Sequence, residues 1–88
     1  MQIGRVVGTV VLNNRNESLS GITLLLVQPL SSSHEPLGRV IVAADSVGAG
    51  VGEHVFFVRG KEASFPFYPT EVPADAGIVG IVDHWHIG

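Results

Sequence analysis

A loop with three glycines between two short apolar runs constrains the fold of this chain more than any other stretch. The runs are residues 40–44 (VIVAA) and 55–58 (VFFV), and the loop between them contains Gly48, Gly50 and Gly52. Both runs are short and rich in β-branched or aromatic residues, so they predict two strands. Glycine accepts positive φ and lets another backbone approach closely. The sequence therefore raises the question of what approaches this loop.

Three further apolar runs complete an all-β pattern. They are residues 3–12, 21–28 and 78–82, each bounded by turn residues. We expect Pro29 to end the second run, and Gly4 and Gly8 to bend the first strand strongly. Pro73 predicts one short helical turn over residues 74–76. Five short strands with glycine kinks predict a small five-stranded barrel of the OB type.

The predicted strands do not alternate between apolar and polar residues, as a strand with one wet face should. Residues 22–27, 40–44 and 55–58 are apolar almost without a break. The chain has 88 residues, of which 45% are apolar and 15% charged. A domain of this size has a thin core, and soluble monomers rarely expose large apolar patches. We expect residues 1–88 to form a single domain whose strands bury their second face against another subunit.

The charge and cysteine content exclude several classes of protein. The formal net charge is −3, with five Lys and Arg residues, so the chain lacks the basic surface of a nucleic-acid-binding protein. It has no cysteine, and therefore no disulfide framework or thiolate chemistry. No apolar stretch approaches the roughly 20 residues of a membrane span, and residues 1–8 lack a secretory signal. We expect a cytosolic protein that binds neither nucleic acid nor membrane.

The glycine loop has both a functional and a structural interpretation. It could cradle a phosphate, but the dinucleotide fingerprint requires a helix after the glycines, and here a strand follows. Asp45 and Glu53, on either side of the loop, could form the acid–base pair of a small barrel enzyme. We favour a structural role because no nucleophile or metal cluster accompanies them. In this interpretation Asp45 caps the turn and Glu53 accepts hydrogen bonds from loop amides.

A proline-rich loop near residue 65 carries three aromatic side chains, Phe65, Phe67 and Tyr68. Aromatic residues of this kind can stack on a ligand or base. With only Lys61 as a basic neighbour, a protein contact is the better interpretation, and a loop that covers its own barrel end is the alternative.

Two histidines, His84 and His86, stand two residues apart near the C-terminal end and would share a face on a strand. Metal sites usually need three or more ligands, and His34 and His54 are distant in the sequence. We therefore expect a tail that is exposed or packed on a neighbour. Trp85 is expected at an interface or over a barrel end.

Four blocks of the sequence resemble the EutN/CcmL family, the vertex proteins of bacterial microcompartments. The blocks are GRVVGTVV (residues 4–11), LSGITLLLVQPL (residues 19–30), VAADSVGAGVGEHVFFVRG (residues 42–60) and PADAGIVGIVD (residues 73–83). The resemblance implies an OB-like barrel that assembles as a cyclic pentamer at the vertices of a shell. It also implies hexameric shell proteins as partners, with the enclosed enzymes as further candidates. The sequence departs from the family pattern at residues 61–64 and after Asp83.

The family's function is architectural, so the resemblance implies no catalytic residue, cofactor or metal. It places the glycine loop near the fivefold axis and its pore, which gives five candidate residues: Gly48, Ala49, Gly50, Gly52 and Glu53. The candidate subunit-interface residues are Arg5, Asp45, Phe65, Phe67, Tyr68 and Trp85. The alternative function is an OB-fold module that binds a ligand or an oligonucleotide, which would require a basic or aromatic groove.

Overall fold

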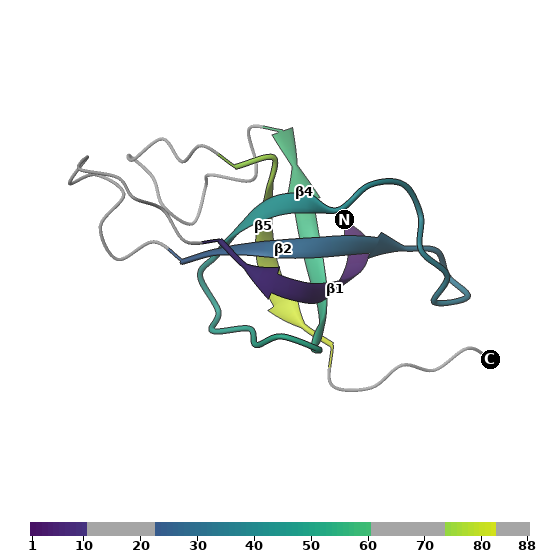
Figure 1. Ribbon diagram of the computed structural model, residues 1–88, viewed down its shortest axis with the longest axis horizontal. Coiled ribbons are helices and arrows are strands. Elements are labelled where there is room, and N and C mark those ends of the chain that lie inside the picture. Colours follow the sequence, from purple (N-terminus) through teal and green to yellow (C-terminus); the bar gives the residue numbers. More distant parts are fainter. Residues whose placement is uncertain (11–22, 61–73, 83–88) are drawn as a thin grey trace.

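The computed structural model describes residues 1–10, 23–60 and 74–82 of the chain. These residues form five strands (Figure 1). In chain order they are β1 (Gln2–Thr9), β2 (Thr23–Leu30), β3 (Ile41–Asp45), β4 (His54–Arg59) and β5 (Ala76–Ile81). Each strand overlaps one of the five apolar runs, so the all-β prediction is confirmed.

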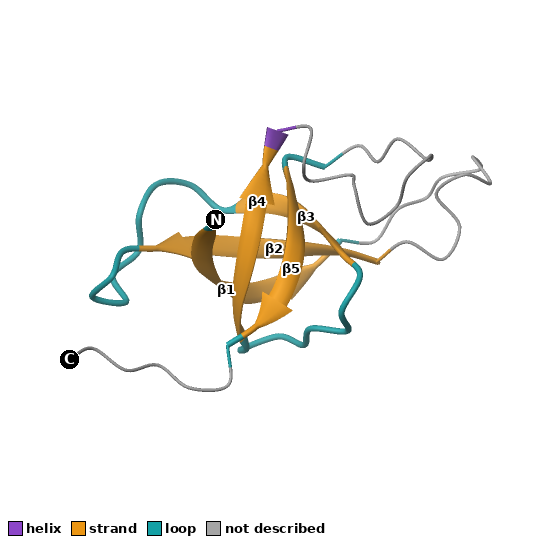
Figure 2. Cartoon of the chain, turned by 180° about the vertical axis from the view of Figure 1, so that it is seen from behind, coloured by secondary structure: helices purple, strands orange, loops and turns teal. Residues whose placement is uncertain are grey.

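The strands close into a barrel in the order β1-β2-β3-β5-β4, with β1 paired to both β2 and β4 (Figure 2). The β3–β5 pair is parallel, and the other four pairs are antiparallel. This arrangement confirms the prediction of a five-stranded OB-like barrel. Closure pairs every strand on both sides, which removes the exposed sheet edges that invite aggregation.

The first strand, β1, meets both neighbours because it bends around the barrel. A bulge interrupts its pairing with β2 between Val6 and Gly8, and a bulge increases local bending and twist. Gly4 is buried, and a Cβ atom added there would lie 2.5 Å from Val27 Cγ1 and 2.9 Å from the Gln28 carbonyl oxygen. Gly4 thus lets β1 and β2 approach closely, as expected for a bent barrel strand.

The core lies inside the barrel and is built from alternate positions of all five strands. The inward side chains share almost complete burial; they are Val6, Leu25, Val27, Ala43, Val55, Phe57, Ala76 and Ile78. Phe57 is the largest of the fully buried side chains. Since these positions alternate along each strand, the apolar residues between them face outward.

Two local predictions are wrong. Pro29 does not end β2, which continues to Leu30. The β2–β3 pairing stops at Val27 and Ile41, so the missing Pro29 N–H costs no hydrogen bond in that ladder. The Pro29 carbonyl oxygen accepts a hydrogen bond from the Leu37 amide at 2.9 Å instead.

The helical turn predicted over residues 74–76 is absent. Ala76 is the first residue of β5, where it pairs with Ala43 and Arg59. The Asp75 amide donates to the Val42 carbonyl oxygen at 3.0 Å, which extends the contact with β3. The sheet therefore uses the backbone groups that a helical turn would have needed.

Candidate functional site

The glycine loop begins at a buried carboxylate. Asp45 ends β3 and is only 9% exposed. Its Oδ1 accepts hydrogen bonds from the amides of Val47 (3.0 Å) and Gly48 (3.2 Å), and its Oδ2 accepts one from Ala49 (2.9 Å). Three amides are thus satisfied by one side chain, and the predicted capping role of Asp45 is confirmed.

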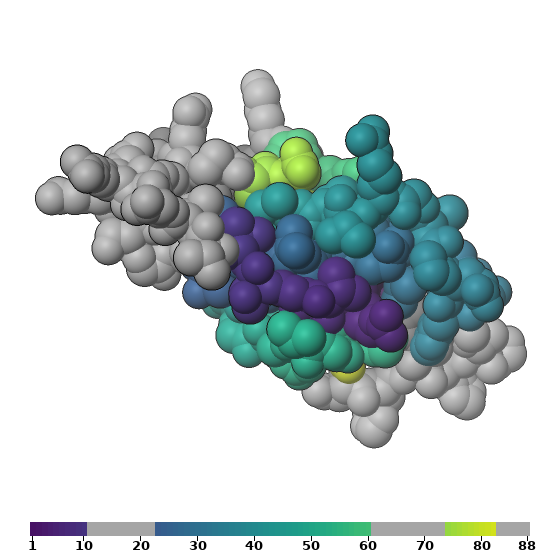
Figure 3. All heavy atoms as spheres, in the orientation of Figure 1, coloured from purple at the N-terminus to yellow at the C-terminus, as the bar shows by residue number. Residues whose placement is uncertain are grey.

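The other end of the loop is fixed by Glu53 and by β1. The Glu53 carboxylate accepts a hydrogen bond from the Gly50 amide, and the Glu53 amide donates to the Gly50 carbonyl oxygen at 3.1 Å. Gly52 N donates to Val6 O at 2.7 Å, and Val6 N donates to Glu53 O at 2.9 Å. The loop therefore lies on the surface directly beside β1, as Figure 3 shows. The predicted role of Glu53 as an acceptor for loop amides is confirmed.

Glycine is needed at two positions of the loop because of the backbone conformation there, and not because neighbouring atoms leave no room for a side chain. Gly48 and Gly52 have φ values of 83° and 93°, a region that side-chain-bearing residues rarely adopt. A Cβ atom on either would meet nothing within 4 Å. Gly50 lacks this constraint, and a Cβ atom there would lie 3.3 Å from Glu53 Oε1. The space outside the loop is open in the isolated chain.

Both carboxylates accept hydrogen bonds from loop amides. Asp45 is buried and accepts from three amides, whereas Glu53 is exposed and accepts from that of Gly50. Each carboxylate thus stabilises its own end of the loop. Arg5, a candidate interface residue, lies on the outward side of β1, where its Cα pairs with those of Gln28 and His54. Asp45 as an interface residue remains a prediction.

A row of half-buried residues crosses the outside of the barrel. It runs through paired positions of four strands: Leu30, Ile3, Phe56 and Gly80. We call these four residues the apolar row. Leu26 and Val42, a further outward pair, are also half-buried. These residues confirm that the strands carry apolar side chains on their second face, where the pair Leu24 and Ala44 is also buried.

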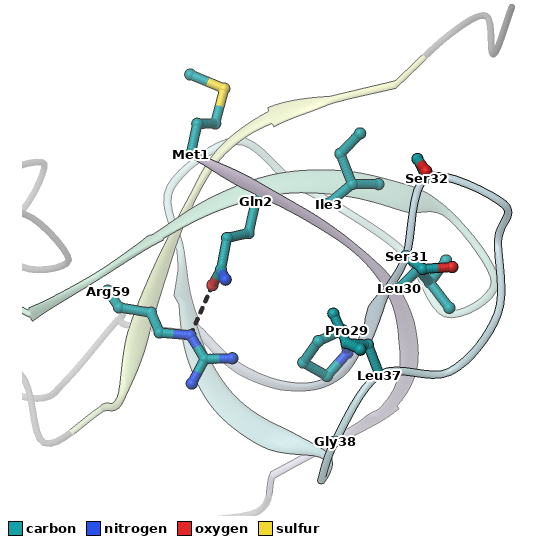
Figure 4. A pocket seen from close by; sticks show the side chains of 10 residues that line it. All are labelled: Met1, Gln2, Ile3, Pro29, Leu30, Ser31, Ser32, Leu37, Gly38 and Arg59. Carbon is teal, nitrogen blue, oxygen red and sulfur yellow. Dashed lines mark hydrogen bonds between the residues drawn. The ribbon is translucent and has the colours of Figure 1, made fainter. Parts of the chain in front are cut away.

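The apolar row continues into a hollow of about 440 Å³ at one end of the barrel (Figure 4). Its walls include Met1, Ile3, Leu30 and Leu37, and Arg59 lies at its rim. Arg59 Nε donates to Gln2 Oε1 at 2.7 Å. The Arg59 guanidinium also lies 5.6 Å from the centre of the Phe57 ring, a favourable cation–π distance. The hollow is therefore mostly apolar, with one fixed cation at its rim.

Four predicted interface residues, Phe65, Phe67, Tyr68 and Trp85, lie outside the described residues, as do His84 and His86. The described residues include no group of three or more potential metal ligands. In the same part of the chain, no helix is long and apolar enough to cross a membrane.

The sequence did not predict the contact between His34 and His54. His34 and His54, twenty residues apart in the sequence, have ring centres only 5.4 Å apart, with the ring planes at 37°. The contact depends on how the turn between β2 and β3 folds back over the barrel, and no local motif indicates that path.

The whole barrel is similar to known shell proteins. The family model described as "Ethanolamine utilisation protein EutN/carboxysome" matches residues 1–83. The chain is 45% identical over 83 residues to the carboxysome shell vertex protein CcmL of Gloeobacter violaceus. The matched region covers 94% of this chain and 83% of that relative. It is also 45% identical over 83 residues to the bacterial microcompartment shell vertex protein GrpN of Rhodospirillum rubrum, covering 94% of this chain and 93% of that relative.

The similarity extends to solved structures. The GrpN pentameric microcompartment shell protein from Rhodospirillum rubrum superposes with a TM-score of 0.83 at 42% identity. The superposition covers 99% of this chain and 100% of that chain.

Proposed function

This chain belongs to the EutN/CcmL family, and from that premise we propose that five copies form a ring at a vertex of a bacterial microcompartment shell. Relatives at 45% identity are shell vertex proteins, and a structural neighbour is a pentameric shell protein. The proposed role is architectural. A sheet of hexagonal tiles is flat, and pentagons at the corners supply the curvature that closes it.

The observation that carries this proposal is the apolar row on the outside of a closed barrel. Ile3, Leu30 and Phe56 are half-buried and lie outside the core cluster of the barrel. A soluble monomer rarely leaves such an apolar surface in contact with water. In a cyclic ring each subunit contacts its two neighbours through two different surfaces. The apolar row and the hollow beside it supply one concave, mostly apolar surface for such a contact.

The glycine loop is our candidate for the contact around the fivefold axis. Gly48 and Gly52 leave open space outside the loop, and Asp45 and Glu53 stabilise both of its ends. Five loops of this kind can approach one another closely, because they have few side chains at the contact and because their own hydrogen bonds hold each loop in one conformation. Ala49, Gly50 and Glu53 complete the set that we place near the axis.

The proposed partners are four further copies of the chain, hexameric shell proteins at the edges of the ring, and the enclosed enzymes on its inner face. The ring would lie in a shell in the bacterial cytoplasm. We propose no catalytic activity, because Asp45 and Glu53, the carboxylates beside the loop, serve loop amides.

The mass of the assembly tests the proposal directly. Native mass spectrometry and light scattering at micromolar concentration should give five chains per particle. A stable monomer or dimer would contradict a vertex role. Coexpression with hexameric shell proteins then tests the architectural step: electron microscopy should show closed polyhedra with this chain, and sheets or open tubes without it. Closed shells in both cases would show that the ring does not supply the corners.

A further inference from the structure

The Arg59 side chain is held in one position at the end of the barrel. Its Nε donates to Gln2 Oε1 at 2.7 Å, and its guanidinium lies 5.6 Å from the centre of the Phe57 ring. Figure 4 shows that a terminal nitrogen of the guanidinium is turned toward Pro29, a residue that lines the hollow. Arg59 is exposed in the isolated chain, yet these two contacts fix the direction of its charge.

The positive charge of Arg59 is balanced by no carboxylate in the part of the chain that the structure describes. Gln2 and Phe57, its two contacts, are both uncharged. Asp75 precedes Ala76, whose Cα pairs with that of Arg59, but no ion pair joins the two side chains. Water therefore solvates this cation as long as the chain is alone.

A concave, mostly apolar surface surrounds the cation. Arg59 lies at the rim of the hollow of about 440 Å³ that the apolar row enters. It also lines a second hollow of about 490 Å³, together with Met1, Gln2, Phe57 and Val58. Met1 is 82% exposed and Leu37, in the wall of the first hollow, is 57% exposed. A partner that covers these apolar side chains therefore covers Arg59 as well.

Covering this surface removes water from the Arg59 guanidinium. A cation that loses its water in an apolar contact is costly unless an opposite charge replaces that water. Arginine binds a carboxylate well because its planar group offers parallel N–H donors. Gln2 uses only Nε, so both terminal nitrogens stay available for an acceptor. The surface therefore suits a partner that brings apolar side chains and one carboxylate.

A second copy of this chain has the required chemistry. The chain contains eight Asp and Glu residues against five Lys and Arg residues, so it offers more carboxylates than cations. The hollow is also continuous with the apolar row, the surface that we assign to the contact between subunits. In a cyclic ring this surface meets a different surface of the neighbour.

We propose that Arg59 binds a carboxylate of the neighbouring subunit and thereby sets the direction of the contact in the ring. This inference rests on the proposed pentamer. A cation on one surface and a carboxylate on the other attract only when the subunits are arranged head to tail. Two copies that met through the same surface would bring two Arg59 cations together, and like charges oppose such a symmetric dimer.

Charge reversal at Arg59 tests the proposal. We expect Arg59→Glu to give folded chains that do not form rings, measured by native mass spectrometry at micromolar concentration with circular dichroism as the check of folding. Arg39→Glu is the matched control, because Arg39 is also exposed but lines neither hollow. The control should form pentamers as the parent does.

A second reversal identifies the carboxylate. In the Arg59→Glu protein, each Asp and Glu except the buried Asp45 is changed to Lys, one at a time. One of these lysines should restore the pentamer, because it forms the same ion pair with the signs exchanged. In the parent background the same lysine should weaken the ring, since it then faces the Arg59 cation.

Arg59→Met tests the same contact without adding a charge of the opposite sign. Methionine keeps an apolar stem but leaves the neighbour's carboxylate without its cation. The concentration at which the pentamer dissociates should therefore rise by about tenfold or more. Light scattering over a dilution series measures it.

Several outcomes would overturn the proposal: normal pentamers of Arg59→Glu, an equal loss in Arg39→Glu, unchanged dissociation of Arg59→Met, or no restored ring with any lysine. In each of these cases a pentameric parent would leave the vertex role intact. A parent chain that forms no pentamer would overturn both proposals, so the two failures are distinguishable.

Discussion

Gly4 and Val27 lie so close across the β1–β2 ladder that a Cβ atom on Gly4 would be 2.5 Å from Val27 Cγ1. The same atom would be 2.9 Å from the Gln28 carbonyl oxygen, which belongs to the backbone and cannot turn away. The barrel thus depends on the absence of a side chain at Gly4, where β1 packs against β2.

Gly4→Ala should therefore destabilise the protein by about 1–3 kcal/mol, the usual cost of overpacking a core. Urea denaturation followed by circular dichroism measures the change. Gly8→Ala is the matched control on the same strand: its nearest neighbour is Leu26 Cδ1 at 3.3 Å, the end of a flexible side chain. Equal losses in the two variants would contradict this account of Gly4.

Asp45→Ala should cost about 2–3 kcal/mol, since it removes the acceptor for three loop amides next to the core. Glu53→Ala, at the other end of the loop, removes an exposed acceptor for one amide and should cost less than about 1 kcal/mol. The unfolding free energies of the two variants, measured by urea denaturation, show which carboxylate stabilises the protein more. If the Glu53 variant lost as much as the Asp45 variant, burial of Asp45 would not be what stabilises the loop.

Gly50→Leu tests the position of the loop at the fivefold axis. Gly50 is exposed and free of the positive φ found at Gly48 and Gly52, so a side chain there leaves the backbone of one chain unstrained. We expect folded subunits that fail to form pentamers, because five leucines would crowd the axis. Native mass spectrometry reads the outcome, with Gly50→Ala as the control. Intact pentamers of unchanged stability in the leucine variant would place the loop away from the axis.

Phe56→Lys tests the apolar row. Phe56 is half-buried on the outer face of β4, between the core positions Val55 and Phe57. A charge there should leave the barrel folded and convert the pentamer into monomers, since an unpaired charge is costly in an apolar interface. Light scattering measures the number of chains per particle, and circular dichroism shows whether the barrel is folded. Phe56→Leu should retain the pentamer; pentamers of the lysine variant would exclude the row from the subunit contact.

The strands could be predicted from sequence because each overlaps its own short apolar run between turn residues. The same runs predicted an apolar outer face, since residues 55–58 do not alternate. The roles of Asp45 and Glu53 in the loop were also predictable, because a carboxylate beside glycines commonly accepts from nearby amides. These features depend on residues close together in the chain.

Features set by distant pairing were not predictable. Pro29 looks like a strand end until the register shows that β3 no longer pairs beside it. Residues 74–76 look like the start of a helix until Ala76 meets Ala43 and Arg59. The approach of His34 to His54 likewise follows from the three-dimensional path of a turn.

The pairing of β5 with both β3 and β4 also governs when the protein can fold during synthesis. A ribosome releases β1 to β4 first, yet the barrel stays open until Ile81, the last residue of β5, has emerged. Until then the β3 edge and the far side of β4 are unpaired, and such edges invite association between nascent chains. Barrel closure therefore has to wait for the last of the five strands to be synthesised.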